Sequence, residues 1–209
     1  DSRNNLMHHG VLPEKIRIMK RGVDTQRFCP GTIARDPQVF TLVTSCRLSK
    51  DKGLEYLLSA VKILLEKHRN LRWKFVGDGP YRQEMQEELK GYQVEFTGFL
   101  HDSHYVDVIR QSDLFVFPSS SDTFGQTPLE AQACGVPVLV TDRGGPKDNV
   151  LDGETGLIVE GENAAALVEG VEMLLDKHLL ASMGREAGKF ASTRSFDTAF
   201  HELYAHYAI

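Results

Sequence analysis

Two carboxylates lie eight positions apart in the stretch SSSDTFGQTPLEAQACGVPVLVT, at Asp122 and Glu130. Thr127 and Glu130 have the T-x-x-E spacing of a helix-capping box, with Pro128 at the expected first helical position. Asp122 precedes the Phe-Gly pair and is typical of a turn residue that hydrogen-bonds its own backbone. Each acid therefore has a structural interpretation of its own.

A second loop, CRLSKDKG at residues 46–53, carries three cations ahead of an expected helix. Helix starts favour acids because the helix dipole is positive there, so cations at this place indicate a neighbouring anion. A solvated basic loop is the alternative. A bound diphosphate explains the cations and the first loop together, with the amides around Gly125 to Thr127 facing one side of it and Arg47 and Lys52 facing the other.

Two further loops supply weaker signals. The stretch FVGDGP contains Gly77 and Gly79, which permit close backbone approach. The third glycine of a G-x-G-x-x-G dinucleotide fingerprint would fall at Arg82, which disfavours a dinucleotide-dependent oxidoreductase. Phe99 and Leu100 either line a pocket for a base or belong to the core.

These loops separate short β-rich runs from amphipathic runs, which predicts an α/β fold with a doubly wound, Rossmann-like parallel sheet and helices on both faces. Ligands bind at the carboxyl ends of the strands in such a sheet. The last part of the chain, residues 163–207, predicts three consecutive helices as a helical tail. The six expected strands are residues 40–46, 72–77, 94–98, 114–118, 137–141 and 155–159.

The chain divides into an N-terminal segment, residues 1–39, and a Rossmann-like domain, residues 40–209. Within the segment, residues 15–20 predict a short strand and residues 21–24 a turn. The polar start predicts that the segment leads in from an N-terminal domain outside this chain.

Composition narrows the class of protein. A net charge of −5 over 209 residues argues against nucleic acid as a partner. Three cysteines without C-x-x-C spacing predict neither a disulfide framework nor a zinc site, and each is expected as a small buried residue. No apolar run reaches about 18 residues and no signal peptide is evident, which predicts a cytoplasmic protein.

Several ordered motifs together resemble the C-terminal domain of the group 1 retaining glycosyltransferases, which have two Rossmann-like domains in the GT-B fold. The resemblance covers most of the chain. It rests on IRIMKRGVD, CRLSKDKG, FVGDGP, FTGFLHD, FVFPSSSDTFGQTPLEAQACGVPVLVTDRGG and DGETGLIV.

The resemblance implies roles for the charged residues. Arg47 and Lys52 neutralise the donor diphosphate, Glu130 binds ribose hydroxyls, and Asp122 lies beside the donor sugar where the family usually has Glu. Arg47, Lys52 and Asp122 form the expected catalytic set. The remaining expected donor-binding residues are Gly77, Gly79, Phe99, Leu100, Phe124, Gly125, Gln126 and Thr127.

The implied reaction is transfer of a hexose from a UDP-, GDP- or ADP-sugar to an acceptor, with retention and without a metal ion or other cofactor. The acceptor, a sugar, lipid or small molecule, would bind through the absent N-terminal domain, so that this chain alone would be inactive. Peripheral membrane association of the complete protein is compatible with a lipid acceptor. The alternatives are a nucleotide-sugar epimerase of the same architecture and a noncatalytic nucleotide-sugar-binding module.

Overall fold

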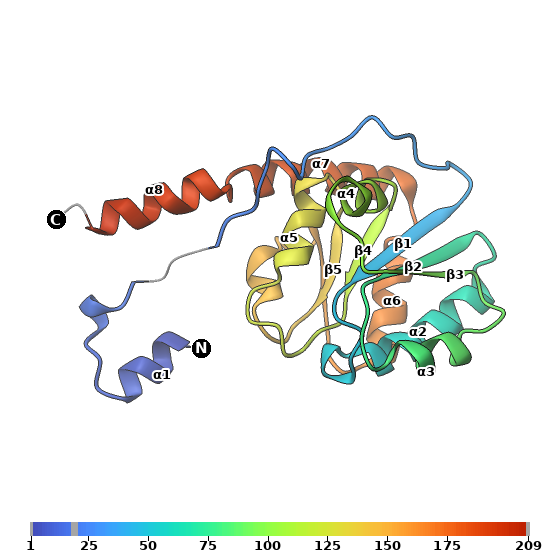
Figure 1. The fold of residues 1–209 in the computed structure, drawn as a ribbon, viewed down its shortest axis with the longest axis horizontal. Coiled ribbons are helices and arrows are strands. Elements are labelled where there is room, and N and C mark those ends of the chain that lie inside the picture. The colour runs from blue at the N-terminus through green and yellow to red at the C-terminus, as the bar shows by residue number, and fades with distance from the viewer. Residues whose placement is uncertain (1, 18–20, 208–209) are drawn as a thin grey trace.

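A computed structural model describes residues 2–17 and 21–207, which fold around a six-stranded sheet (Figure 1). Every strand pair is parallel, and the strand order is β3-β2-β1-β4-β5-β6. The doubly wound parallel sheet predicted from the sequence is therefore confirmed. The strands are β1 Phe40–Ser45, β2 Leu71–Val76, β3 Val94–Gly98, β4 Leu114–Phe117, β5 Val138–Thr141 and β6 Gly156–Val159.

Helices cover both faces of this sheet, as Figure 1 shows. Helices α2 and α6 pack on one face, and α4 and α5 pack on the other. The α-helices are α1 Ser2–His8, α2 Leu54–Lys67, α3 Arg82–Glu88, α4 Asp102–Arg110, α5 Gln126–Ala133, α6 Ala164–Met173, α7 Lys177–Ser192 and α8 Phe196–Tyr207. Short 3-10 helices occupy η1 Pro13–Lys15, η2 Lys50–Lys52 and η3 Pro146–Asn149.

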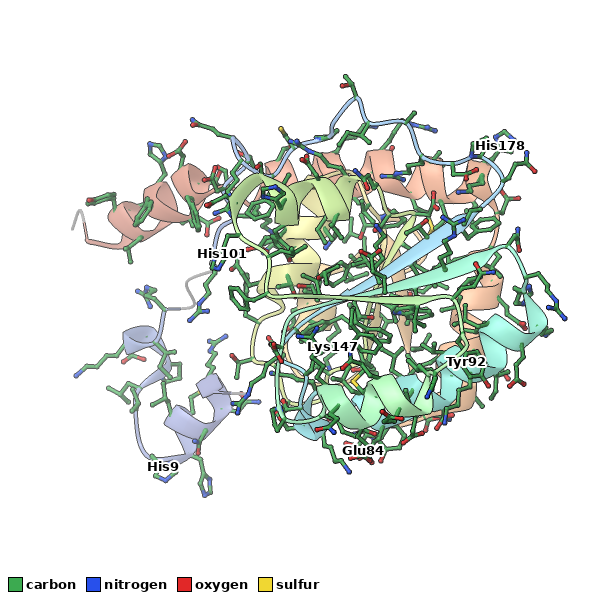
Figure 2. All side chains as sticks on the ribbon, turned by 45° about the vertical axis from the view of Figure 1, so that its right-hand side comes forward. His9, Glu84, Tyr92, His101, Lys147 and His178 are labelled. Carbon is green, nitrogen blue, oxygen red and sulfur yellow. The ribbon has the colours of Figure 1, made fainter. Side chains whose placement is uncertain are left out.

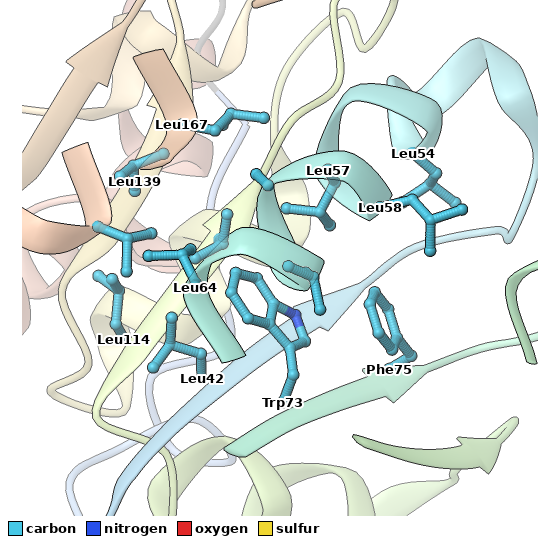
Figure 3. Close-up of a cluster of buried hydrophobic side chains, with 14 of the residues drawn as sticks. Leu42, Leu54, Leu57, Leu58, Leu64, Trp73, Phe75, Leu114, Leu139 and Leu167 are labelled. Carbon is cyan, nitrogen blue, oxygen red and sulfur yellow. The ribbon is translucent and has the colours of Figure 1, made fainter. Parts of the chain in front are cut away.

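The face under α2 holds a leucine-rich core around Trp73 and Phe75 (Figure 3). Helix α2 buries Leu57, Val61 and Leu64, whose helical spacing gives the helix one apolar face. The indole of Trp73 is fully buried, and its Nε1 donates a hydrogen bond to Thr44 Oγ1 at 3.1 Å. The buried polar atom is thereby satisfied, and the sheet is a rigid base for the loops at its carboxyl edge.

The N-terminal segment differs from the sequence-based expectation. The strand expected at residues 15–20 is absent from its described part, since Lys15 ends η1 and residues 16–17 are irregular, while residues 18–20 lie outside the described residues. The turn occupies residues 25–27 rather than 21–24. Tertiary pairing explains this shift, because the backbone of Val23 forms a bridge with Ser195.

The three helices expected in the tail are confirmed as α6, α7 and α8. Figure 1 shows α8 extending away from the body of the sheet. Among the described residues, no helix combines the length and apolar character that crossing a membrane requires.

Candidate functional site

Two adjoining cavities lie beyond the carboxyl ends of β1 to β4. The large cavity measures about 680 Å³ and the small cavity about 310 Å³. Ser45, Cys46, Arg47 and Thr127 line both cavities, so the two are neighbours and are called the hollow together. Of the residues that the sequence predicted for the site, the large cavity contains Gly77, Phe99, Leu100 and Glu130, and the small cavity contains Lys52, Asp122, Phe124 and Gln126.

Glu130 projects from α5 into the large cavity. The phenol of Tyr105, on α4, donates a hydrogen bond to Glu130 Oε2 at 3.2 Å. Partial burial raises the pKa of Glu130 above its ordinary value, and the hydrogen bond from Tyr105 opposes that rise. Burial and the neighbouring Glu130 charge also raise the pKa of Tyr105, so the phenol stays protonated and serves as a donor.

The capping box expected at Thr127 and Glu130 is wrong. Helix α5 begins at Gln126, directly after Gly125, whose φ of 82° is the left-handed conformation that glycine adopts without strain. Thr127 therefore lies inside the first turn, and its Oγ1 donates to the carbonyl of Ser45 at 3.1 Å. Because no cap engages Glu130, its carboxylate is available to a ligand in the cavity.

Asp122 shapes the loop that borders the small cavity. Its Oδ1 accepts hydrogen bonds from the backbone amides of Phe124 at 3.0 Å and Gly125 at 2.7 Å. Its Oδ2 lies 3.5 Å from Lys52 Nζ. Partial burial works against ionisation, but the two amides and the Lys52 charge together hold the pKa of Asp122 below its ordinary value. The turn role predicted for Asp122 is confirmed, and its carboxylate also faces the cavity.

Arg47 occupies the junction of the two cavities. Its side chain is exposed, and none of the described residues forms an ion pair with it. Lys50, in the same loop, instead pairs with Glu84 at 3.3 Å. The loop thus presents Arg47 and Lys52 to the hollow and directs Lys50 to the surface.

Two of the predicted glycines have packing roles. A Cβ on Gly77 would lie 2.1 Å from the carbonyl oxygen of Cys46, and one on Gly79 would lie 2.3 Å from that of Leu48. These glycines let the two loops pack directly against each other. Gly79 and Gly125 line neither cavity. Gly79 instead allows the two loops to pack closely, and Gly125 allows helix α5 to begin at the next residue.

Phe99 is 71% exposed and lines the large cavity, which excludes it from the core. Its ring lies 4.9 Å from that of His101, which is labelled in Figure 2. Leu100 is partly buried against the core on the sheet face that α4 and α5 cover, and it also lines the cavity. Phe99 is therefore an exposed part of the cavity wall, whereas Leu100 both contacts the core and lines the cavity.

Sequence reasoning missed several residues that line the hollow, among them Arg21, Arg27 and Tyr105. Arg21 and Arg27 come from the N-terminal segment, and only tertiary docking of that segment brings them here. The Tyr105 ring packs edge-on against Phe28 of the same segment, with centroids 6.0 Å apart. No spacing rule connects these positions with the loops of the sheet.

The expectation that all three cysteines are buried is correct for one of them. Cys134 is buried as predicted, whereas Cys29 and Cys46 are only partly buried. Burial around the thiol raises the pKa of Cys46 to about 12, so this cavity-lining residue is not a thiolate nucleophile at neutral pH. Within the described residues, no three His, Cys, Asp or Glu side chains are grouped to hold a metal ion.

Comparison with known proteins identifies the family. The family model for glycosyl transferases group 1 matches residues 31–190. A D-inositol 3-phosphate glycosyltransferase of Acidothermus cellulolyticus is 30% identical over 219 residues, covering 95% of this chain and 49% of that protein. The chain spans about half the length of the curated relatives it matches.

Solved structures agree on the fold. The C-terminal domain of a group 1 family protein, LpcC, from Francisella tularensis has a TM-score of 0.73 at 25% identity, covering 83% of this chain and 98% of that one. Anabaena Alr3699/HepE, crystallised with UDP, has a TM-score of 0.85 at 21% identity, covering 99% of this chain and 61% of that one. The chain belongs to the glycosyl transferases group 1 family and matches its C-terminal domain.

Proposed function

We propose that this chain is the donor-binding half of a glycosyltransferase that transfers a hexose from a nucleoside diphosphate sugar with retention of anomeric configuration. The nucleoside occupies the large cavity, where Glu130 accepts hydrogen bonds from the ribose hydroxyls. The diphosphate lies at the junction, and the sugar enters the small cavity beside Asp122. The observation that carries the proposal is that the ion-pair-free Arg47 lines both cavities between the two carboxylates.

The family comparisons support this placement. Anabaena Alr3699/HepE, which shares the fold over 99% of this chain, was crystallised with UDP-glucose as well as with UDP. The carboxyl edge of a parallel sheet is also where such folds bind nucleotides. Retention is supported by the motif resemblance in the loops CRLSKDKG and SSSDTFGQTPLE.

The chemistry follows from the charges around the junction. Breaking the bond between the sugar and the diphosphate leaves negative charge growing on the leaving group. Arg47, Lys52 and the positive start of α5 are arranged to stabilise that charge before the reaction begins. These fixed cations take the part that a divalent metal has in other sugar-nucleotide sites, so the proposed reaction needs no metal ion.

The acceptor site belongs to the part of the enzyme outside this chain. We propose that residues 40–209 form the donor domain, that residues 1–39 connect it to an N-terminal domain, and that the latter binds a sugar, lipid or small-molecule acceptor. The proposed location is cytoplasmic, with peripheral membrane contact where the acceptor is a lipid. Only the complete enzyme would hold both reacting groups in attack geometry.

Calorimetric titration with UDP, GDP and ADP tests the proposal. We expect one of them to bind, and Arg47→Ala or Lys52→Ala to weaken that binding by about 10- to 100-fold, because hydrogen bonds to charged groups are worth about 1.5 to 3 kcal/mol. Lys50→Ala is the matched control, since Lys50 lies in the same loop but pairs with Glu84 away from the hollow. Absence of binding to all three nucleotides would refute the proposal, as would unchanged binding by Arg47→Ala.

A further inference from the structure

We propose that Arg21, from the N-terminal segment, is a third cation of the donor site and binds the diphosphate together with Arg47 and Lys52. This inference rests on the proposed function and adds a binding residue from outside the sheet. It also gives the N-terminal segment a direct part in donor recognition.

Arg21 is placed at the small cavity by its contacts. It lines that cavity together with Arg47, Lys52 and Asp122. Its guanidinium carbon lies 5.9 Å from the centre of the Phe124 ring, within the range of a cation–π contact. No carboxylate among the described residues forms an ion pair with Arg21, so its charge remains available.

The residues that follow Arg21 fix the backbone at this point. Val23 is fully buried, its amide donates to the carbonyl of Arg194 at 2.8 Å, and its carbonyl accepts from the amide of Phe196 at 3.1 Å. A Cβ on Gly22 would lie 2.6 Å from the backbone of Phe196, so only glycine fits there. The chain next to Arg21 is therefore clamped to the junction between α7 and α8.

A contact with the start of helix α5 also holds the backbone next to Arg21. Gln126 Nε2 donates to the carbonyl of Gly22 at 3.4 Å. Gln126 is the first residue of α5 and lines the small cavity. Arg21 is thereby linked to the helix start that faces the diphosphate.

The charge balance of the small cavity favours a third cation. The two phosphates of a nucleoside diphosphate sugar each carry one negative charge at neutral pH. Lys52 is engaged in part by Asp122, whose Oδ2 lies 3.5 Å from its ammonium. Three cations and one carboxylate leave two positive charges for the diphosphate, whereas Arg47 and Lys52 without Arg21 would leave only one. A guanidinium also suits phosphate oxygens because its donors form a planar fork.

The test compares Arg21→Gln with the matched control Arg17→Gln. Arg17 belongs to the same segment, donates to the carbonyls of Glu14 and Ile16, and lines neither cavity. UDP binding is measured by calorimetry and uridine binding by NMR titration. We expect Arg21→Gln to weaken UDP binding about tenfold or more while uridine binding stays as in the parent, because uridine carries no phosphate. Arg17→Gln should bind both as the parent does, and Arg21→Lys should recover part of the UDP affinity.

The outcomes separate the inference from the proposed function. If Arg47→Ala loses UDP binding while Arg21→Gln binds UDP as the parent does, the inference is overturned and the proposed function stands. An equal loss of UDP and uridine binding in Arg21→Gln would also overturn it, because Arg21 would then act by holding Phe124. If the parent binds no nucleoside diphosphate, the proposed function fails first and the inference fails with it.

Discussion

Replacing Glu130 by Gln tests the assignment of the ribose site by changing the charge of one side chain and almost nothing of its shape. In the structure Glu130 makes no helix cap; Tyr105 donates a hydrogen bond to its Oε2, and the Gln126 side chain also stabilises the carboxylate. Glutamine keeps one oxygen that can accept from Tyr105. The substitution should therefore preserve the local packing and remove the carboxylate alone.

The size of the expected loss follows from this contact. The carboxylate of Glu130 accepts a hydrogen bond from Tyr105 at Oε2, Gln126 also stabilises its ionised form, and the bonds from ribose hydroxyls would add to these contacts. In Glu130→Gln the single oxygen is taken by Tyr105, so the amide NH2 turns toward hydroxyls that need an acceptor. Charge-assisted hydrogen bonds exceed neutral ones by about 1 to 2 kcal/mol. We expect UDP affinity to fall about 5- to 30-fold.

The melting temperature of Glu130→Gln should not fall together with its UDP affinity. Burial raises the pKa of Glu130, so the folded protein holds this proton more tightly than the unfolded chain. Its ionisation therefore costs folding free energy as the pH rises through the raised pKa. Glu130→Gln avoids that cost and should melt at the same or a higher temperature than the parent at neutral pH. The difference should vanish in acid, where both side chains are neutral.

Calorimetry with UDP and with its 2′,3′-dideoxy analogue provides the assay, together with thermal unfolding from pH 4 to 8. The parent should bind the dideoxy analogue poorly, and Glu130→Gln should lose little more with that ligand. A variant that melts clearly lower at neutral pH yet binds UDP as the parent does would refute the ribose assignment and make Glu130 a structural residue.

Three further expectations concern the metal, the loop packing and the proposed second domain. UDP or GDP should bind equally well with and without a chelator, because Arg47 and Lys52 supply the positive charge; a strict need for magnesium or manganese would contradict this. Gly77→Ala should lower the free energy of unfolding in urea by at least about 2 kcal/mol, since its φ of 123° and the Cys46 carbonyl both oppose a Cβ. Gly91→Ala, with positive φ but open space around it, should cost only about 1 kcal/mol, and equal losses would refute the packing role of Gly77. This chain alone should bind donor without transferring sugar, and transfer at the rate of the complete enzyme would show that no second domain is needed. If the complete enzyme releases sugar without an acceptor, an epimerase is favoured. If it binds the donor and turns nothing over, a noncatalytic module is favoured.

Much of the fold could be read from the sequence because the signals are local. Alternation of apolar runs such as LFVF with amphipathic runs such as that of α2 fixes the order of strands and helices. All six strands and the three tail helices appear within a few residues of their expected ranges. The failures lie where a distant partner decides the local conformation, as at residues 21–24, where pairing of Val23 with Ser195 replaces the expected turn.

The candidate site divides in the same way. The loops of Arg47, Lys52 and Asp122 were singled out because they follow strands, and parallel strands bring such loops to one edge. The roles expected of Asp122 and Glu130 toward the donor came from the family resemblance. The pattern T-x-x-E at Thr127 suggested a cap because a local motif cannot show that the helix already begins after Gly125.

The sequence by itself determined the family motifs, the parallel sheet and the loops that carry the charged residues, since all of these follow from short-range pattern and chain connectivity. Tertiary structure alone decided that Lys52 pairs with Asp122, that Tyr105 donates a hydrogen bond to Glu130, and that the N-terminal segment brings Arg21 to the small cavity. The physical reason is sequence distance: Arg21 and Gln126 are 105 residues apart, and the backbone contacts of Gly22 and Val23 help to hold them at one cavity.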